Sequence, residues 1–171
     1  MKNDLVKYFR NSIAVVALLI AAAAQNSVQA QLEPGKSAQS ADRIVGAWET
    51  TVQPRNCDTG EAIGNPFPGV LTFNQGGTLA EFGANPTTPF RTPGHGIWTY
   101  NAVTRDYTMK FTFLPLTPAG VAVGRLRVTQ SVQLGRFSDE FTSSGGFVLT
   151  NFNGNVIGTG CSTSTAVRLN P

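Results

Sequence analysis

Charge, histidine and cysteine are all scarce in this sequence. Charged residues make up 13% of its 171 residues, and it contains one histidine and two cysteines. A zinc site needs three or four nitrogen, sulfur or carboxylate ligands, and the usual combinations cannot be built from one histidine and two bridged cysteines. The Gly-x-Ser-x-Gly turn of the α/β-hydrolases is also absent. We therefore expect no metal and no cofactor.

Helical periodicity is missing as well. After residue 42 no segment of useful length repeats its apolar residues with the helical period, whereas short alternating segments are separated by glycine, proline and asparagine. The links between these segments are too short for the crossovers that parallel strands require. The pattern therefore predicts an all-β chain with antiparallel strands joined in sequence order.

Only one long apolar run is present, at residues 13–24. It follows a basic start and precedes small residues that end at Ala30, which is typical of a cleaved signal peptide at residues 1–30. An uncleaved anchor is the alternative, although a span takes about 20 apolar residues. Residues 31–42 are polar and small, so we expect a flexible tether before one domain at residues 43–171. The predicted location is periplasmic or extracellular.

Without residues 1–30 the chain is almost neutral, with 10 basic and 9 acidic residues. Arg125 and Arg127 are its only close basic pair. A nucleic-acid surface needs a basic stripe and a membrane surface needs a polybasic patch. We therefore expect neither nucleic acid nor, after leader cleavage, a membrane as a partner. The oligomeric state stays open.

Eight or nine short strands are predicted. A meander of this size either closes into an up-and-down barrel or splits into a sandwich. The last segment is predicted as one strand with a glycine-marked bulge, or as two. The expected strands are 44–52, 70–73, 78–82, 97–101, 107–114, 121–134, 137–143, 147–151 and 156–169.

The two cysteines favour the barrel. Cys57 follows the first predicted strand and Cys161 lies in the last. In an exported chain a lone pair of cysteines usually forms a disulfide, and the alternative is two free thiols. A disulfide requires Cα atoms within about 7 Å, so the first and last strands would be neighbours. The prediction is a closed antiparallel up-and-down barrel.

Gly46-Ala47-Trp48, at the start of the first strand, resembles the Gly-x-Trp motif of lipocalins and the wider calycin group. The resemblance implies a lipocalin-like barrel in which Arg168 of the last strand stacks on Trp48 and plugs one end. The chain departs from the family in being short and in lacking the usual helix after the barrel. Residues 55–60, 72–79 and 92–98 also resemble exported bacterial proteins, a likeness that implies no activity.

Aromatic residues recur at even spacings in several predicted strands, such as Trp98 with Tyr100, two positions apart, and Phe137 with Phe141, four positions apart. A barrel of about eight strands can hold one small ligand, and aromatic walls suit an apolar guest. The alternative is that these side chains fill a solid core. We therefore expect a small hydrophobic ligand inside the barrel. The predicted lining is Phe73, Trp98, Tyr107, Met109, Phe111, Phe113 and Val128.

Two other functions remain open. An isomerase or cyclase that resembles the allene oxide cyclase type of barrel would need an inward polar residue in a similar cavity. Glu81 shares a face with Leu79 and is the candidate, with a shifted pKa if Lys110 or Arg127 lies beside it. The third reading is a non-catalytic structural or protein-binding domain.

Three other carboxylates and the histidine are weaker candidates. Glu49 should point outward because it neighbours Trp48 in the strand. Asp139 and Glu140 are adjacent and should face opposite sides, so they do not form a glycosidase pair. His95, between two glycines, is either an exposed acid–base group or a turn residue before a strand. No catalytic residue is predicted.

Overall fold

The computed structural model describes residues 41–169. The predicted signal peptide and most of the predicted tether lie outside these residues. A short 3-10 helix, η2 (Asp42–Ile44), is followed by eight strands and no α-helical element. The strands are β1 (Gly46–Arg55), β2 (Phe67–Phe73), β3 (Thr78–Gly83), β4 (Gly94–Tyr100), β5 (Tyr107–Phe113), β6 (Arg125–Leu134), β7 (Glu140–Thr150) and β8 (Val156–Arg168).

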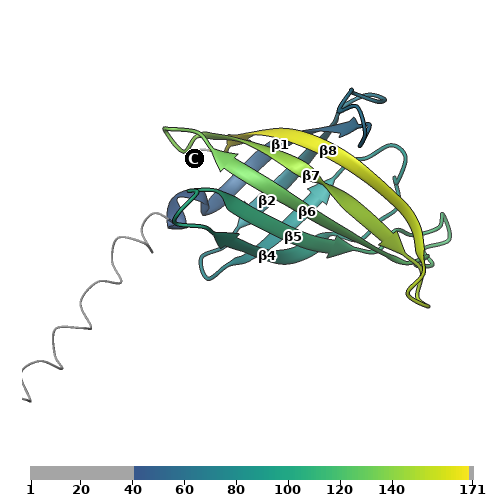
Figure 1. Cartoon of the computed structure of the whole chain (residues 1–171). Coiled ribbons are helices and arrows are strands. Elements are labelled where there is room, and N and C mark those ends of the chain that lie inside the picture. The colour runs from purple at the N-terminus through teal and green to yellow at the C-terminus, as the bar shows by residue number, and fades with distance from the viewer. Residues whose placement is uncertain (1–40, 170–171) are drawn as a thin grey trace, which may run out of the picture. The chain divides into compact units, whose positions relative to one another are not determined.

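The strands form a closed barrel in sequence order (Figure 1). Each strand pairs antiparallel with the next, and β8 returns to pair with β1, where Trp48 lies opposite Arg168. The predicted fold class, an all-β closed antiparallel up-and-down barrel, is therefore confirmed with eight strands. Closure removes the free sheet edges on which other chains could pair.

Alternation along each strand explains why the sheet closes with one face inward. In β6 exposed and buried residues alternate from Arg125 to Gln133. In β5 the buried positions are Tyr107, Met109, Phe111 and Phe113. Because successive side chains point to opposite faces of a strand, the buried set lies inside the barrel and the polar set outside.

The predicted disulfide is present between Cys57 and Cys161. Their Cα atoms are 5.2 Å apart although 104 residues separate them in the sequence. The bridge ties the β1–β2 loop to β8, next to the pairing of Arg55 with Cys161 that closes the barrel. A link of this kind stabilises mainly by restricting the unfolded chain.

Three local predictions were wrong. Ile44 does not begin the first strand, because it ends η2 and its side chain is fully buried. Residues 137–143 and 147–151 are not two strands, since β7 runs without a break through Gly145. Phe137 lies in a turn and is 81% exposed, so it does not share a face with Phe141.

Among residues 41–169, no helix has the length and apolar character needed to cross a membrane.

Candidate functional site

The two ends of the barrel differ in how they are closed. At the end where β1 begins and β8 finishes, the guanidinium carbon of Arg168 lies 4.2 Å from the Trp48 ring centroid. Arg168 also donates to the carbonyl oxygens of Ser138, Val45 and Arg43, at 2.6, 2.7 and 2.7 Å. The resemblance to lipocalins implied this stacking of Arg168 on Trp48. We call this end the sealed end.

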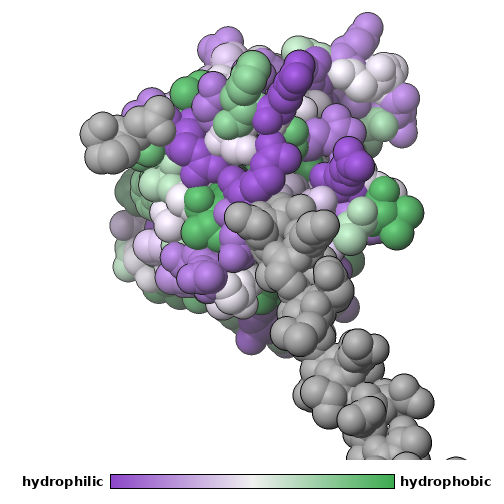
Figure 2. All heavy atoms as spheres, turned by 90° about the vertical axis from the view of Figure 1, so that its left-hand side faces the viewer, coloured by the Kyte–Doolittle hydropathy of each residue, from purple (hydrophilic) through white to green (hydrophobic). Residues whose placement is uncertain are grey.

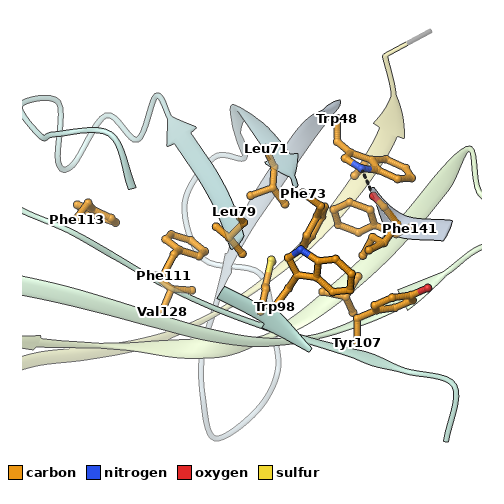
Figure 3. Packing of buried hydrophobic residues seen from close by; sticks show 14 of the residues in the cluster. Trp48, Leu71, Phe73, Leu79, Trp98, Tyr107, Phe111, Phe113, Val128 and Phe141 are labelled. Atoms are coloured by element: carbon orange, nitrogen blue, oxygen red, sulfur yellow. Dashed lines mark hydrogen bonds between the residues drawn. The ribbon is translucent and has the colours of Figure 1, made fainter. Parts of the chain in front are cut away.

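An aromatic cluster fills the barrel behind this plug (Figure 3). The rings of Trp48 and Phe141 are 4.9 Å apart and meet edge to face. Phe73 contacts both Phe141 and Trp98 in the same way. The indole nitrogen of Trp48 donates to the carbonyl of Ile44 at 3.0 Å, which fixes η2 over the end. Hydrophilic residues make up much of the outer surface of this end in Figure 2.

The opposite end, where β1 finishes and β8 begins, is less closed. We call it the open end. Several of its inward-facing residues are only partly buried, whereas Trp48 and Val132 at the sealed end are 0% exposed. Phe113 and Leu126, which also face inward at this end, are buried. The partly buried inner residues are Val52, Pro54, Phe67, Phe147, Leu149, Gly160 and Ser162.

Glycine is concentrated on the inner face at the open end. At Gly160 the missing side chain leaves room for the ring of Phe147, which lies over it from β7. At Gly94 an added Cβ would sit 2.7 Å from Oε2 of Glu81. Gly158 is different, because the nearest atoms to an added Cβ belong to Leu149 at 3.7 and 3.8 Å. A Cβ at Gly158 would thus fit without overlap, in van der Waals contact with Leu149, whereas one at Gly160 or Gly94 would not fit.

A buried ion pair lies on the inner wall at the open end. Glu81 projects inward from β3 and pairs with Arg91, which reaches back from the β3–β4 loop. The two side chains are 14% and 4% exposed, respectively. The guanidinium carbon of Arg91 lies 3.5 Å from the centroid of the Phe113 ring. Glu81 faces inward as predicted, but Lys110 and Arg127 are exposed on the outside, so the predicted partners were wrong.

Burial raises the pKa of the Glu81 carboxyl above its ordinary value, and the hydrogen bond and charge of Arg91 offset part of this rise. A carboxyl with a raised pKa is a better proton donor and acceptor near neutral pH than an ordinary one. Tyr107 also faces inward, and burial raises its pKa to about 12, so its hydroxyl stays neutral.

A second polar group on the inner wall was missed by the sequence analysis. Gln130 of β6, Ser143 of β7 and Ser164 of β8 are 4%, 5% and 6% exposed, and they hydrogen-bond to one another. The alternation in β6 could have revealed it, because Gln130 is the one polar residue among the inward-facing positions Leu126, Val128 and Val132.

All seven predicted lining residues face the inside of the barrel, but they do not form one site. Phe73, Trp98 and Tyr107 belong to the cluster behind the sealed end. Phe111 and Phe113 lie progressively farther from that cluster in Figure 3. Val128 pairs with Phe111 and Phe147 on the side of the open end, whereas Met109 lies between Trp98 of the cluster and Gln130 in the middle of the barrel.

The remaining candidates lie on the outer face of the barrel or around the β6–β7 turn at the sealed end. His95 and Glu49 are exposed on outward phases of β4 and β1. Asp139 lies in a turn and Glu140 begins β7 with an exposed side chain. Two surface hollows of about 470 and 520 Å³ also lie on the outer wall, lined largely by outward residues of β1, β2 and β6–β8. None of these groups faces the open end's inner wall.

Comparisons of the chain with protein-family models, with curated proteins and with solved structures gave no significant match.

Proposed function

We propose that this protein is an exported, lipocalin-like carrier that binds a small apolar molecule inside the open end of its barrel. The observation that carries the proposal is the difference between the two ends. Trp48 and Arg168 close one end, while inner-wall residues such as Val52 and Phe147 stay partly accessible at the other. A barrel of eight strands has an interior of the size that one small ligand can occupy.

The inner wall at the open end suits such a guest. Phe111, Val128 and Phe147 supply apolar surface from three adjacent strands. Gly158 on β8 keeps the wall thin, since an added Cβ there would meet only Leu149, at 3.7 Å. Ligand pockets typically combine such apolar walls with a few placed polar groups, here Glu81 with Arg91 and the Gln130 cluster.

Two features support the exported, lipocalin-like part of the proposal. The Gly46-Ala47-Trp48 motif stands at the sealed end with Arg168 stacked on its tryptophan, which is the arrangement that the lipocalin resemblance implies. The Cys57–Cys161 disulfide is of a kind that persists in oxidising compartments such as the periplasm or the medium.

Ethylbenzene titration, followed by NMR, tests the carrier proposal. Met109 is one of two methionines in the chain, so the signal of its 13C-labelled methyl group is simple to assign. We expect ethylbenzene to shift the Met109 methyl signal and to leave the indole N–H signal of Trp48 in place. A Met109 signal that stays fixed up to the solubility limit of ethylbenzene would contradict binding at the open end.

A blocking variant locates the guest. Gly158→Leu adds a side chain on the inner wall where the backbone has room for it, and we expect it to abolish the ethylbenzene shift at Met109. Thr159→Leu is the matched control, because Thr159 is the next residue of β8 and points outward. Equal binding by both variants would place the guest elsewhere. Native mass spectrometry of protein purified gently from its own host then seeks the natural ligand.

Glu81 favours a second candidate function, an isomerase or cyclase of the allene oxide cyclase barrel type. Its carboxyl faces the inside among apolar residues and has a raised pKa, the combination that suits proton transfer. The test is hydrogen–deuterium exchange at the α-carbon of a ketone guest in D2O. This candidate expects exchange catalysed by the protein and lost in Glu81→Gln. Binding of the ketone without catalysed exchange would rule out the isomerase or cyclase candidate and leave only the carrier proposal.

A further inference from the structure

A chain of four polar side chains crosses the inner wall from β8 through β7 to β6 and back to β8. Ser143 donates its hydroxyl hydrogen to Oε1 of Gln130 at 2.6 Å. Ser143 also hydrogen-bonds to the hydroxyl of Ser164. Gln130 in turn donates from Nε2 to the hydroxyl oxygen of Ser162 at 2.9 Å. The chain therefore begins at Ser164 and ends at Ser162.

The number of hydrogens gives this chain a direction. A serine hydroxyl has one hydrogen to donate. Ser143 uses its hydrogen on Gln130, so Ser164 must be the donor in the bond between Ser164 and Ser143. Ser162 only accepts in this row of hydrogen bonds, and among residues 41–169 no group accepts the hydrogen of its hydroxyl. The row of four hydrogen-bonded side chains thus ends on the hydroxyl of Ser162, which can still donate one hydrogen bond.

Gly145 makes the connection from β6 to β8 possible. It lies on β7 directly opposite Gln130 on one side and Ser162 on the other. An added Cβ at Gly145 would lie 3.1 Å from Cγ of Gln130 and would overlap the carbonyl oxygen of Thr129. With glycine there, the Gln130 side chain can lie across β7 and reach Ser162. The arrangement holds the Ser162 hydroxyl in one place.

Ser162 lies at the open end. It pairs with Pro54 near the end of β1 and is partly exposed, unlike Ser143 and Ser164 deeper in the barrel. Gln130, which holds it, pairs with Met109 across β5 and β6. A ligand that enters the open end and reaches Met109 would therefore also reach the Ser162 hydroxyl, which can donate a hydrogen bond to it.

We infer that the ligand is an apolar molecule carrying a neutral carbonyl oxygen, which accepts the hydrogen bond that the Ser162 hydroxyl offers. This inference rests on the proposed carrier function and names its ligand class. A neutral acceptor fits better than a carboxylate, because the inward cation at this end, Arg91, is already paired with Glu81. An anion would lose its hydration there without gaining a counter-charge.

Three small aromatic probes of similar size test the ligand class. Acetophenone has the carbonyl, ethylbenzene replaces it with a CH2 group, and benzoate carries a charge. Following the Met109 methyl signal, we expect acetophenone to bind about tenfold more tightly than ethylbenzene, as one added hydrogen bond allows. Benzoate should bind more weakly than acetophenone. Equal affinities for acetophenone and ethylbenzene, or tighter binding of benzoate, would overturn the inference.

Variants of Ser162 assign the preference to this hydroxyl. Ser162→Ala should bring the acetophenone-to-ethylbenzene affinity ratio close to one, and Ser162→Thr, which keeps a hydroxyl, should retain most of it. Ser144→Ala is the control, since Ser144 is a hydroxyl on the outer face of β7. An unchanged ratio in Ser162→Ala would overturn the assignment. If Ser162→Ala does not fold, Ser162→Thr and the wild-type ratio decide.

The outcomes separate this inference from the carrier proposal. If ethylbenzene and acetophenone both leave Met109 unshifted, the carrier proposal fails and the ligand class falls with it. If both bind with the same affinity, the carrier proposal stands and only the carbonyl inference fails.

Discussion

The sealed and open ends of this barrel are built from the same eight strands, but small inward residues gather at the open end on β8 and β4, beside large ones such as Phe113 and Phe147. Trp48, Phe73 and Phe141 fill the sealed end, and each is 2% exposed or less. At the open end the inner positions of β8 are held by glycine and serine, and those of β3 and β4 by Glu81 and Gly94. Close packing of large rings stabilises a core, whereas small residues leave room. The densest packing of aromatic rings therefore lies at the sealed end, and the proposed carrier function uses the other end.

The largest expected effect comes from two phenylalanines on the same inward face of β7. Phe141→Ala at the sealed end should lower the free energy of unfolding by about 3–5 kcal/mol, because it leaves a cavity among packed rings. Phe147→Ala at the open end should cost about 1–2 kcal/mol, because its ring is already partly exposed. Urea unfolding of both variants measures the difference. Equal losses would mean that the ends do not differ in packing.

A smaller effect is expected from the two arginines that stack on rings, one at each end. Arg168→Lys should cost about 2–3 kcal/mol, because an ammonium cannot reach the three carbonyls that the guanidinium joins. Arg91→Lys should cost about 1 kcal/mol, since a lysine can still pair with Glu81. Thermal unfolding checks the order. A larger loss from Arg91→Lys would make the open end the more tightly built of the two.

The smallest effect is a pH dependence specific to the open end. The pKa of Glu81 is raised above 4.5 in the folded protein, so the protonated carboxyl is favoured by folding. Its contribution to the free energy of unfolding is present below pH 4.5 and is lost as the pH rises through the folded pKa. Stability of the wild type should therefore fall over this range relative to Glu81→Gln.

Urea midpoints at a series of pH values measure this difference, and only the slope is compared, because Glu81→Gln also leaves Arg91 without its ionic partner. Glu49→Gln is the control, since Glu49 is exposed on the outer face of β1. Parallel pH profiles for the wild type and Glu81→Gln would show that the effect of burial on the Glu81 pKa does not exceed the opposing effect of Arg91.

The strands and the barrel could be predicted because their causes are local. The alternation from Tyr107 to Phe113 identifies β5 whatever surrounds it, and the turn at Asn153-Gly154-Asn155 joins β7 to β8 as the sequence indicates. The errors arose where local signals are ambiguous. Gly145 and Gly146 are typical of a turn, but in β7 they are strand residues, because Gly145 must be small where Gln130 crosses over it.

The partner of Glu81 could not be predicted. Lys110 and Arg127 lie in strands that the sequence predicts, but their side chains point outward from β5 and β6. Arg91 lies in the β3–β4 loop, and the alternation that assigns strand residues to the inner or outer face does not apply to a loop. Its place follows from the pairing of Arg91 with Pro115, which links the β3–β4 and β5–β6 loops and brings the guanidinium against Phe113.

The sequence by itself determined the order and antiparallel pairing of the strands, which side chains of strands such as β5 face inward, and the link between Cys57 and Cys161. Alternation and turn residues act over short stretches, and cysteine pairing follows from simple chemistry. Only the tertiary structure decided that β7 is one strand, that Arg91 partners Glu81, and that the row of polar side chains ends on Ser162. These depend on how the strands are staggered around the barrel, and stagger places residues from distant strands at the same height.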